Sequence, residues 1–405
     1  GKFQGVHHDT SLTLSDASKL FKIKYEKLSE NVYNSANVLL GRVKKSYTFT
    51  GKQLQITIPQ SFAGGVGSGS LPKPNVAKYS EAVIRAKKVY AVVEIDRETI
   101  KAALSDEGAF VRATKEVVQK GVESFMRNMS RILFNDGSGS IGTVSAKDGT
   151  SLPQVLTISD ATWKEANFEE RDLIQKSGGG LLEIDVVDPD NKQITVKDPS
   201  ISGNTAAALA VSDVLYMQGS KDSDPEGLKL LDKTSGDSYG VTHGRRWKAQ
   251  QKDAGSAAIS TDMLNEMMLK VKKACGKSPN LIVTSFKQYE KILNLLEDQK
   301  RYTVNTRAGL KSKSGADISF SGVEFMSIDG PIGIFPERFV EDDRVYLLND
   351  SNIHIYHRPD FGWFDDDGTV FLRKAGEDSY EARYGGYLEV YINPCFHGVI
   401  DNLSV

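Results

Sequence analysis

The feature that most constrains this sequence is one long amphipathic stretch between residues 105 and 135. Apolar side chains recur there at intervals of three, four and seven residues, as at Val111, Val118, Phe125 and Met129, and charged side chains fill many positions between them. This spacing predicts a single helix of about 30 residues, roughly 45 Å long at 1.5 Å per residue. A typical globular helix is about a third as long. The sequence therefore predicts a fold organised around one rigid strut.

Both ends of this helix carry capping signals. Ser105 is a candidate N-cap, and Asn135, Asp136 and Gly137 follow the last apolar position, where glycine can adopt the left-handed conformation that ends helices. The adjoining loop NDGSGSIG (135–142) contains serines but lacks the G-x-S-x-G pattern that exposes a nucleophile. We interpret this loop as a structural turn.

The segments before the helix predict an extended arm. Residues 44–59 alternate apolar and polar positions around Gly51, which predicts a β-hairpin. Residues 61–75 are rich in glycine and proline and predict a long loop. Residues 83–96 are rich in valine and isoleucine and predict one strand, and residues 15–35 have the spacing of a short helix.

After the helix the pattern changes to short strands. We expect a small antiparallel β unit at 143–220, with strands at 154–159, 181–187, 192–197 and 211–218. Residues 219–258 are polar and predict connecting segments. A capped helix beginning at Ser260, a second capped at Ser285, and strands at 280–285, 316–328, 344–349 and 352–357 make the last third α+β.

Composition excludes several classes of function. The 405 residues include 51 basic and 53 acidic side chains, a net charge of −2, without the basic excess typical of dedicated DNA-binding proteins. No apolar run is long enough to cross a bilayer, and no signal peptide is recognisable. Cys275 and Cys395 form no CxxC pair and no disulfide framework. We expect both to be small core residues in a protein of the reducing cytoplasm.

The candidate chemical motifs are incomplete. The loop GGVGSGS (64–70) lacks the Lys-Ser/Thr end of a P-loop and the third glycine of a dinucleotide fingerprint. His354 and His357 are three apart in a predicted strand and so lie on opposite faces. The cluster Asp365–Asp367, before Gly368, reads first as a hairpin turn. We therefore predict no catalytic residue, no cofactor and no metal site.

The order of elements resembles a known family. An arm, then VIRAKKVYAVVEIDRETIKAALSDEGAF, then a very long helix ending in RILFNDGSGSIG, is similar to the major capsid proteins of tailed bacteriophages. The resemblance implies the Hong Kong 97-type shell fold, an α+β class with an extended β-hairpin arm, a spine helix, an axial domain and here an inserted β subdomain. It implies these divisions: an N-terminal arm (1–41), a hairpin arm (42–82), a peripheral domain with the spine helix (83–142), the inserted β subdomain (143–220), a connecting segment (221–258), an axial domain (259–345) and returning peripheral strands (346–405).

The same resemblance implies a function. Such proteins assemble through pentameric and hexameric capsomers into an icosahedral virion capsid around double-stranded DNA, without sequence-specific DNA contacts and without a membrane. The expected partners are many copies of the chain together with scaffolding, portal and decoration proteins, and assembly is expected in the host cytoplasm. Candidate contacts between subunits lie on the arm and the long helix. They are Lys52, Gly65, Gly67, Lys73, Arg112, Glu123 and Arg127.

Two alternatives stay open at this point. A cellular nanocompartment shell of the encapsulin type shares the fold and holds protein cargo instead of a genome. A metal-dependent cytoplasmic hydrolase, with a metal on Asp366 and its neighbours, would lose activity on Asp366→Ala.

Overall fold

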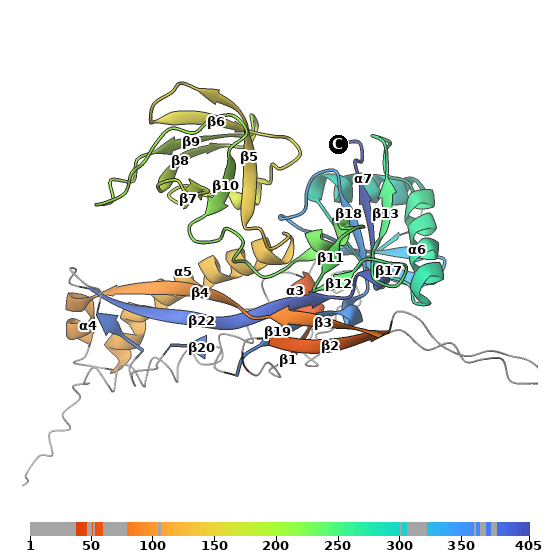
Figure 1. Cartoon of the computed structure of the whole chain (residues 1–405), viewed down its shortest axis with the longest axis horizontal. Coiled ribbons are helices and arrows are strands. Elements are labelled where there is room, and N and C mark those ends of the chain that lie inside the picture. The colour runs from red at the N-terminus through yellow and green to blue at the C-terminus, as the bar shows by residue number, and fades with distance from the viewer. Residues whose placement is uncertain are drawn as a thin grey trace, which may run out of the picture.

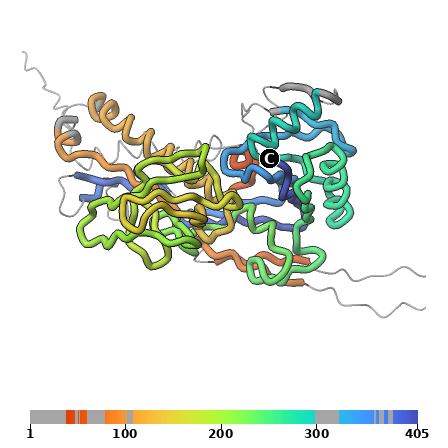
Figure 2. Tube along the Cα trace, turned by 90° about the horizontal axis from the view of Figure 1, so that it is seen from above, coloured from red at the N-terminus to blue at the C-terminus, as the bar shows by residue number. Residues whose placement is uncertain are grey.

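The computed structural model describes residues 38–46, 51, 53–59, 79–103, 107–299, 302–305, 322–359, 362–364, 370–373 and 379–405. The helix predicted at 15–35, the loop at 61–75 and the Asp365–Asp367 cluster lie outside these residues. In the described part, a long base sheet carries two lobes, a β-barrel and an α/β lobe (Figure 1). Seen from above, the two lobes lie side by side on the base (Figure 2).

The base sheet is organised around one long strand, β22 (Ser379–Ile392). One edge of β22 pairs antiparallel with β4 (Lys87–Asp96), and the other edge pairs in turn with β21 (Leu372–Arg373), β20 (Gly362–Trp363) and β19 (Ile353–His357). Buried and exposed residues alternate along β4, because successive side chains of a strand point to opposite faces. One face of this sheet is therefore apolar and must be covered.

The predicted long helix covers that face. It is α5 (Glu107–Leu133), a helix of 27 residues, and α4 (Arg97–Ala103) leads into it. Phe125 of α5 is fully buried and meets the ring of Tyr384 edge-on, with 5.3 Å between the ring centroids. A Cβ at Gly121 would lie only 2.5 Å from Val93 Cγ2, so glycine at this position allows the helix to approach β4 closely. The prediction of a long strut is confirmed.

The arm differs from its prediction. β1 (Lys44–Ser46), which follows the short helix α3 (Val38–Arg42), pairs in parallel with β19 in the base sheet. β2 (Gln53–Pro59) instead pairs antiparallel with β3 (Tyr79–Arg85). The predicted hairpin at 44–59 is therefore wrong, because the turn at Gly51 (φ 81°) carries the chain from one sheet to another. The single strand predicted at 83–96 is also two strands, β3 and β4, which separate at Ala86.

The barrel forms directly after α5. Its strands close in the order β10-β5-β6-β9-β8-β7, each antiparallel to its neighbours. They are β5 (Ser140–Asp148), β6 (Gln154–Ile158), β7 (Leu173–Lys176), β8 (Leu182–Asp188), β9 (Gln193–Lys197) and β10 (Val214–Met217). The hairpin predicted around 188–191 is confirmed as β8 and β9. The strands β5 and β7 were not predicted, because turns and polar residues interrupt their apolar pattern.

The connection from the barrel to the α/β lobe is more structured than predicted. It contains a 3-10 helix η2 (Leu228–Asp232), the strand pair β11 (Asp237–Ser238) and β12 (Val241–Thr242), and β13 (Gln250–Asp253). β13 joins the α/β sheet by pairing in parallel with β23 (Gly398–Asp401). Segments read as polar linkers therefore contribute to two sheets.

The α/β lobe has a sheet in the order β13-β23-β18-β14-β17-β16-β15. Its remaining strands are β14 (Leu281–Thr284), β15 (Tyr302–Asn305), β16 (Gly322–Ser327), β17 (Gly330–Pro336) and β18 (Val345–Leu348). Helices α6 (Thr261–Cys275) and α7 (Phe286–Gln299) pack against it through Leu264, Met268, Ile292 and Leu296. The predicted cap of α6 is confirmed, since Ser260 Oγ accepts a hydrogen bond from Met263 N and Gly276 ends the helix with φ 80°.

The two cysteines correct a further prediction. Cys275, at the end of α6, forms a disulfide with Cys395, whose Cα lies 6.0 Å away. Cys395 belongs to the short 3-10 helix η4 (Pro394–Phe396) between β22 and β23. The reading of both as unlinked core residues was wrong, because the two lie 120 positions apart and only the fold brings them together.

Candidate assembly surfaces

The base of the arm is held by an aromatic cluster. Trp247 is fully buried, and Tyr239, Tyr391 and Tyr356 form a chain of ring contacts beside it. The same cluster includes Ile58, Ala82 and Ile84 from β2 and β3. Trp247, a tryptophan in an otherwise polar segment, is the sequence signal that points to this cluster. The arm is thus packed at its root on residues from other parts of the chain.

Tyr239 also forms hydrogen bonds with β22, beyond the residues of β22 that pair with β4, and with β3. Its backbone oxygen accepts from Val83 N at 2.9 Å. Its hydroxyl donates to the oxygen of Val390 and accepts from Ile392 N at 3.2 Å. Burial raises the pKa of this phenol well above its usual range, so Tyr239 stays a neutral donor. Tyr239 therefore joins the arm strand β3, through its backbone oxygen, to the end of β22, through its hydroxyl.

Along the exposed surface of the arm, polar residues alternate with half-buried ones. On β2, Gln53, Gln55 and Thr57 are exposed, whereas Leu54 and Ile56 are half-buried. At the far end of β3, Tyr79 is 59% exposed. The predicted contacts Lys52, Gly65, Gly67 and Lys73 lie outside the described residues.

The predicted contact residues of the long helix α5 lie on different sides of it. Arg112 and Glu123 lie on its exposed face, near the exposed ion pair of Glu116 and Lys120. Arg127 instead points to the barrel, where Nη1 lies 2.7 Å from Asp172 Oδ2 and the guanidinium also donates to the carbonyls of Ala166 and Asn167. The described contacts of Arg127 are therefore made within its own subunit.

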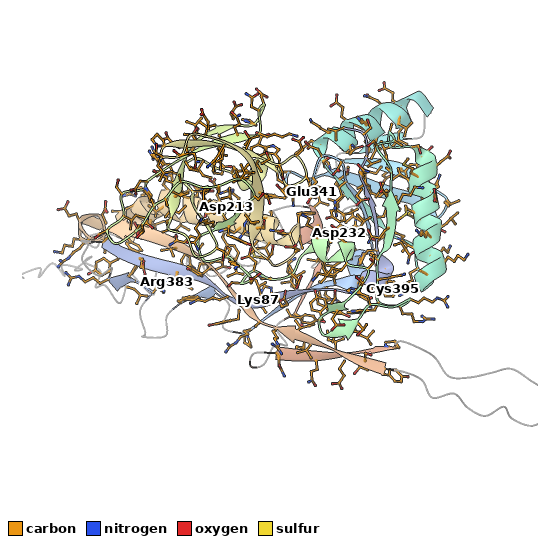
Figure 3. All side chains as sticks on the ribbon, turned by 45° about the horizontal axis from the view of Figure 1, so that its top comes forward. Lys87, Asp213, Asp232, Glu341, Arg383 and Cys395 are labelled. Atoms are coloured by element: carbon orange, nitrogen blue, oxygen red, sulfur yellow. A yellow bond between two sulfur atoms is a disulfide. The ribbon has the colours of Figure 1, made fainter. Side chains whose placement is uncertain are left out.

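A buried ionic cluster joins the barrel to the α/β lobe. Lys164 Nζ lies 3.2 Å from Glu341 Oε1 and donates to the oxygen of Phe134, just beyond the end of α5. Glu341 also faces Lys229 and Arg344, and Arg344 pairs with Asp232. Burial opposes ionisation of Glu341, but these cations lower its pKa to about 2. Figure 3 shows Glu341 between the two lobes, where this junction cluster fixes their relative position.

A second buried cluster lies where β4 begins to pair with β22. Arg131 Nη1 is 2.7 Å from Asp224 Oδ2, and Lys87 Nζ is 3.9 Å from Glu389 Oε2. Glu389 Oε1 accepts hydrogen bonds from the backbone nitrogens of Glu226 and Val390. Burial raises the pKa of Glu389 to about 8, despite the nearby Lys87. The base sheet therefore holds a carboxylic acid that is largely protonated at neutral pH.

A cleft of about 570 Å³ separates the barrel from the α/β lobe above the junction cluster. Its walls include Trp163, Lys192, Phe286 and Glu337, and neither histidine nor cysteine is among its lining residues. Burial raises the pKa of Glu337 to about 7.

Among the described residues, no group of three or more His, Cys, Asp or Glu side chains is arranged to hold a metal. In the same residues, no helix has the length and apolar character to span a membrane.

Comparisons with known proteins agree with this architecture. Residues 189–370 match the family model of the SU10 major capsid protein. A search of curated proteins found no match. The capsid asymmetric unit of cyanophage A-1(L) aligns over 91% of this chain and 92% of that chain, with a TM-score of 0.50 and 10% identity.

Two further structures align with lower scores. A chain from Mycobacterium phage Bobi aligns over 91% of this chain and 90% of that chain, with a TM-score of 0.43 and 10% identity. The encapsulin of a holo-SrpI complex from Synechococcus elongatus aligns over 89% and 85%, with a TM-score of 0.44 and 9% identity.

The family match and the fold lead to the same conclusion. The match covers the end of the barrel, the connection and most of the α/β lobe. The alignment with the cyanophage capsid extends the likeness of fold to 91% of this chain. Residues 189–370 are thus similar to the SU10 major capsid protein family, and the chain has the Hong Kong 97-type α+β shell fold.

Proposed function

We propose that this chain forms pentameric and hexameric capsomers, which close into an icosahedral shell around a double-stranded DNA genome. The observation that carries this proposal is the β2–β3 arm, which in the described residues is a two-stranded sheet that packs one face on its own subunit and leaves the other face exposed. A two-stranded hairpin is marginally stable by itself, so a neighbouring copy would supply the missing cover. Contacts of this kind are heterologous, and they generate rings where the rotation between subunits closes.

Within such a shell, each part of the chain has a proposed place. Residues 42–82 would lie across a neighbour, α5 would span the peripheral domain, and residues 259–345 would meet around the capsomer centre. Arg112 and Glu123 on the exposed face of α5, and Lys52, Gly65, Gly67 and Lys73 in the arm, are the proposed contacts. Arg127 is proposed to act indirectly, because it holds the barrel on α5.

The proposed partners are other copies of the chain, a separate scaffolding protein, a portal and decoration proteins. Near-neutral charge suits a container for DNA, since strongly basic walls would retain the genome. Assembly in the host cytoplasm and the lack of any enzymatic activity belong to the same proposal.

Electron microscopy of the purified chain, with and without its scaffolding protein, tests this function. Closed shells or rings of five and six subunits are the expected result, and nuclease-protected DNA inside particles from infected cells would separate a capsid from a cargo-holding nanocompartment. A small monodisperse species under both conditions would contradict the proposal. Asp366→Ala is then informative, because only a metal-dependent hydrolase would lose an activity through it.

A further inference from the structure

The Cys275–Cys395 disulfide occupies a mechanically important place. β22 belongs to the base sheet and β23 belongs to the α/β sheet, so residues 393–397 carry the chain from one to the other. We call these residues the crossover. Cys395 lies in the crossover, and Cys275 ends α6 on the α/β lobe. The bond therefore ties a helix of one lobe to the strand connection from the base, as the position of Cys395 in Figure 3 shows.

Non-covalent contacts already hold the crossover in position. Asn393 Oδ1 accepts from Cys395 N at 3.2 Å, and the buried His397 accepts from Asn349 N through Nδ1 at 3.1 Å. Cys275 Sγ lies 2.8 Å from the carbonyl oxygen of Cys395, so a reduced Cys275 thiol has an acceptor within reach. The same backbone arrangement can thus accommodate two thiols or one disulfide.

The two sulfurs differ in access to solvent. Cys275 is half-buried at the surface end of α6, whereas Cys395 is only 4% exposed. A small thiol or disulfide reagent therefore reaches Cys275 first. This asymmetry gives the pair an entering residue and a resolving residue, as in thiol–disulfide exchange.

We propose that Cys275 and Cys395 form a redox-dependent clamp, open as two thiols during assembly and closed as a disulfide after the particle leaves the cell. The timing rests on the proposed assembly in the cytoplasm, where thiols stay reduced. The oxidant is a low-molecular-weight disulfide such as glutathione disulfide. Closing the clamp constrains the chain between residues 275 and 395, which resists separation of the α/β lobe from the base.

The exchange balances in two steps. The Cys275 thiolate attacks one sulfur of glutathione disulfide, forms a mixed disulfide and releases one glutathione thiolate. The Cys395 thiolate then attacks Sγ of Cys275 and releases the second glutathione. The cysteine pair loses two electrons and two protons, and both are recovered in the two molecules of reduced glutathione.

The test uses full-length subunits and assembled particles, equilibrated with reduced or oxidised glutathione, alkylated and weighed by mass spectrometry. Under reduced glutathione both cysteines should alkylate. Under oxidised glutathione the chain should lose the mass of two hydrogen atoms, retain no adduct, and unfold at a temperature higher by roughly 5 °C or more. Because subunits are measured as well as particles, a failure of the clamp is distinguishable from a failure of shell assembly.

Single variants sharpen this test. Cys395→Ser should leave Cys275 carrying one glutathione, whereas Cys275→Ser should leave the native chain without an adduct, because Cys395 is buried. Cys275→Ser/Cys395→Ser should unfold at one temperature in both buffers. Free alkylation of both cysteines in the native wild-type chain under oxidised glutathione would overturn the proposal. So would equal unfolding temperatures of the oxidised and reduced wild-type chain, a comparison that needs no variant to fold.

Discussion

The barrel and the β2–β3 arm are both antiparallel, but they bury their apolar faces in opposite ways. Each barrel strand pairs on both sides, and the barrel core comes from its own residues, between Ile141 and Leu215. In the described residues, β2 and β3 form a sheet of two strands whose cluster borrows Val241, Trp247 and Tyr391 from elsewhere. Closure removes free strand edges, whereas a lone hairpin keeps them. The barrel is therefore stable within one subunit, whereas the stability of the arm depends on contacts with residues outside its two strands.

The sharpest test of this comparison replaces one tryptophan in each region. Trp247→Ala removes the centre of the arm cluster and should lower the free energy of unfolding by about 3–5 kcal/mol. It should also abolish shell assembly, because the root of the arm loses its packing. Hydrogen exchange of the β2 and β3 amides and electron microscopy would measure the two effects.

Trp163→Ala is the matched control in the barrel. Trp163 is 7% exposed and stacks on Phe168 with 5.0 Å between the ring centroids. Its loss should speed hydrogen exchange in the barrel and leave assembled shells in the micrographs. If Trp163→Ala stopped assembly while Trp247→Ala permitted it, the division of roles between barrel and arm would be wrong.

The junction cluster tests how firmly the barrel is attached. Glu341→Gln leaves Lys164 buried without its counter-charge and should cost about 3–5 kcal/mol of stability. Lys164→Met with Glu341→Met should cost clearly less than the sum of the two single changes, because no charge remains buried alone. Urea unfolding of the wild type, Lys164→Met, Glu341→Met and the double variant gives this coupling energy. Strictly additive costs would show that Lys164 and Glu341 are not coupled.

Sequence patterns predicted the elements whose signals are local. The spacing of Phe125 and its neighbours specified α5, and Ser260 and Gly276 marked the ends of α6. The hairpin β8–β9 followed from a turn between adjacent strands. In each case the residues that determine the element lie within a few positions of it.

Long-range pairings were not predictable in this way. Gly51 signalled a turn, but the turn does not specify that β1 pairs with β19, more than three hundred positions away. The contacts of Lys164 with Glu341, and of Cys275 with Cys395, likewise exist only once the fold has formed. The assembly surfaces were not predictable for the same reason. Arg127 and Glu123 are both charged positions of the helix in the sequence, and only the folded barrel, which contacts Arg127, distinguishes them.

Glu389 predicts a pH dependence of the base sheet. Burial raises the pKa of this carboxyl to about 8, from an ordinary value of 4.5. Between these values the folded chain keeps a proton that the unfolded chain releases, so its contribution is complete below pH 4.5 and falls as the pH rises towards 8. The loss is on the order of a few kcal/mol. Unfolding by urea from pH 5 to 9 would measure it.

Glu389→Gln should flatten this contribution, since the amide oxygen can still accept from Glu226 N and Val390 N without titrating. Glu123→Gln on the exposed face of α5 is the control and should follow the wild-type profile. An unchanged slope in Glu389→Gln would assign the pH dependence to another group.

The smallest expected effect separates two neighbouring residues of α5. Arg127→Ala removes a partly buried ion pair with Asp172 and two hydrogen bonds to the barrel, which should cost about 1–2 kcal/mol. Glu123→Ala, on the exposed face, should change subunit stability by less than about 0.5 kcal/mol. Glu123→Ala should slow assembly more than Arg127→Ala does, because a neighbouring subunit can reach the exposed face of α5. Thermal unfolding of subunits and light scattering during assembly would measure both, and slower assembly in Arg127→Ala than in Glu123→Ala would assign the subunit contact to the barrel side of the helix.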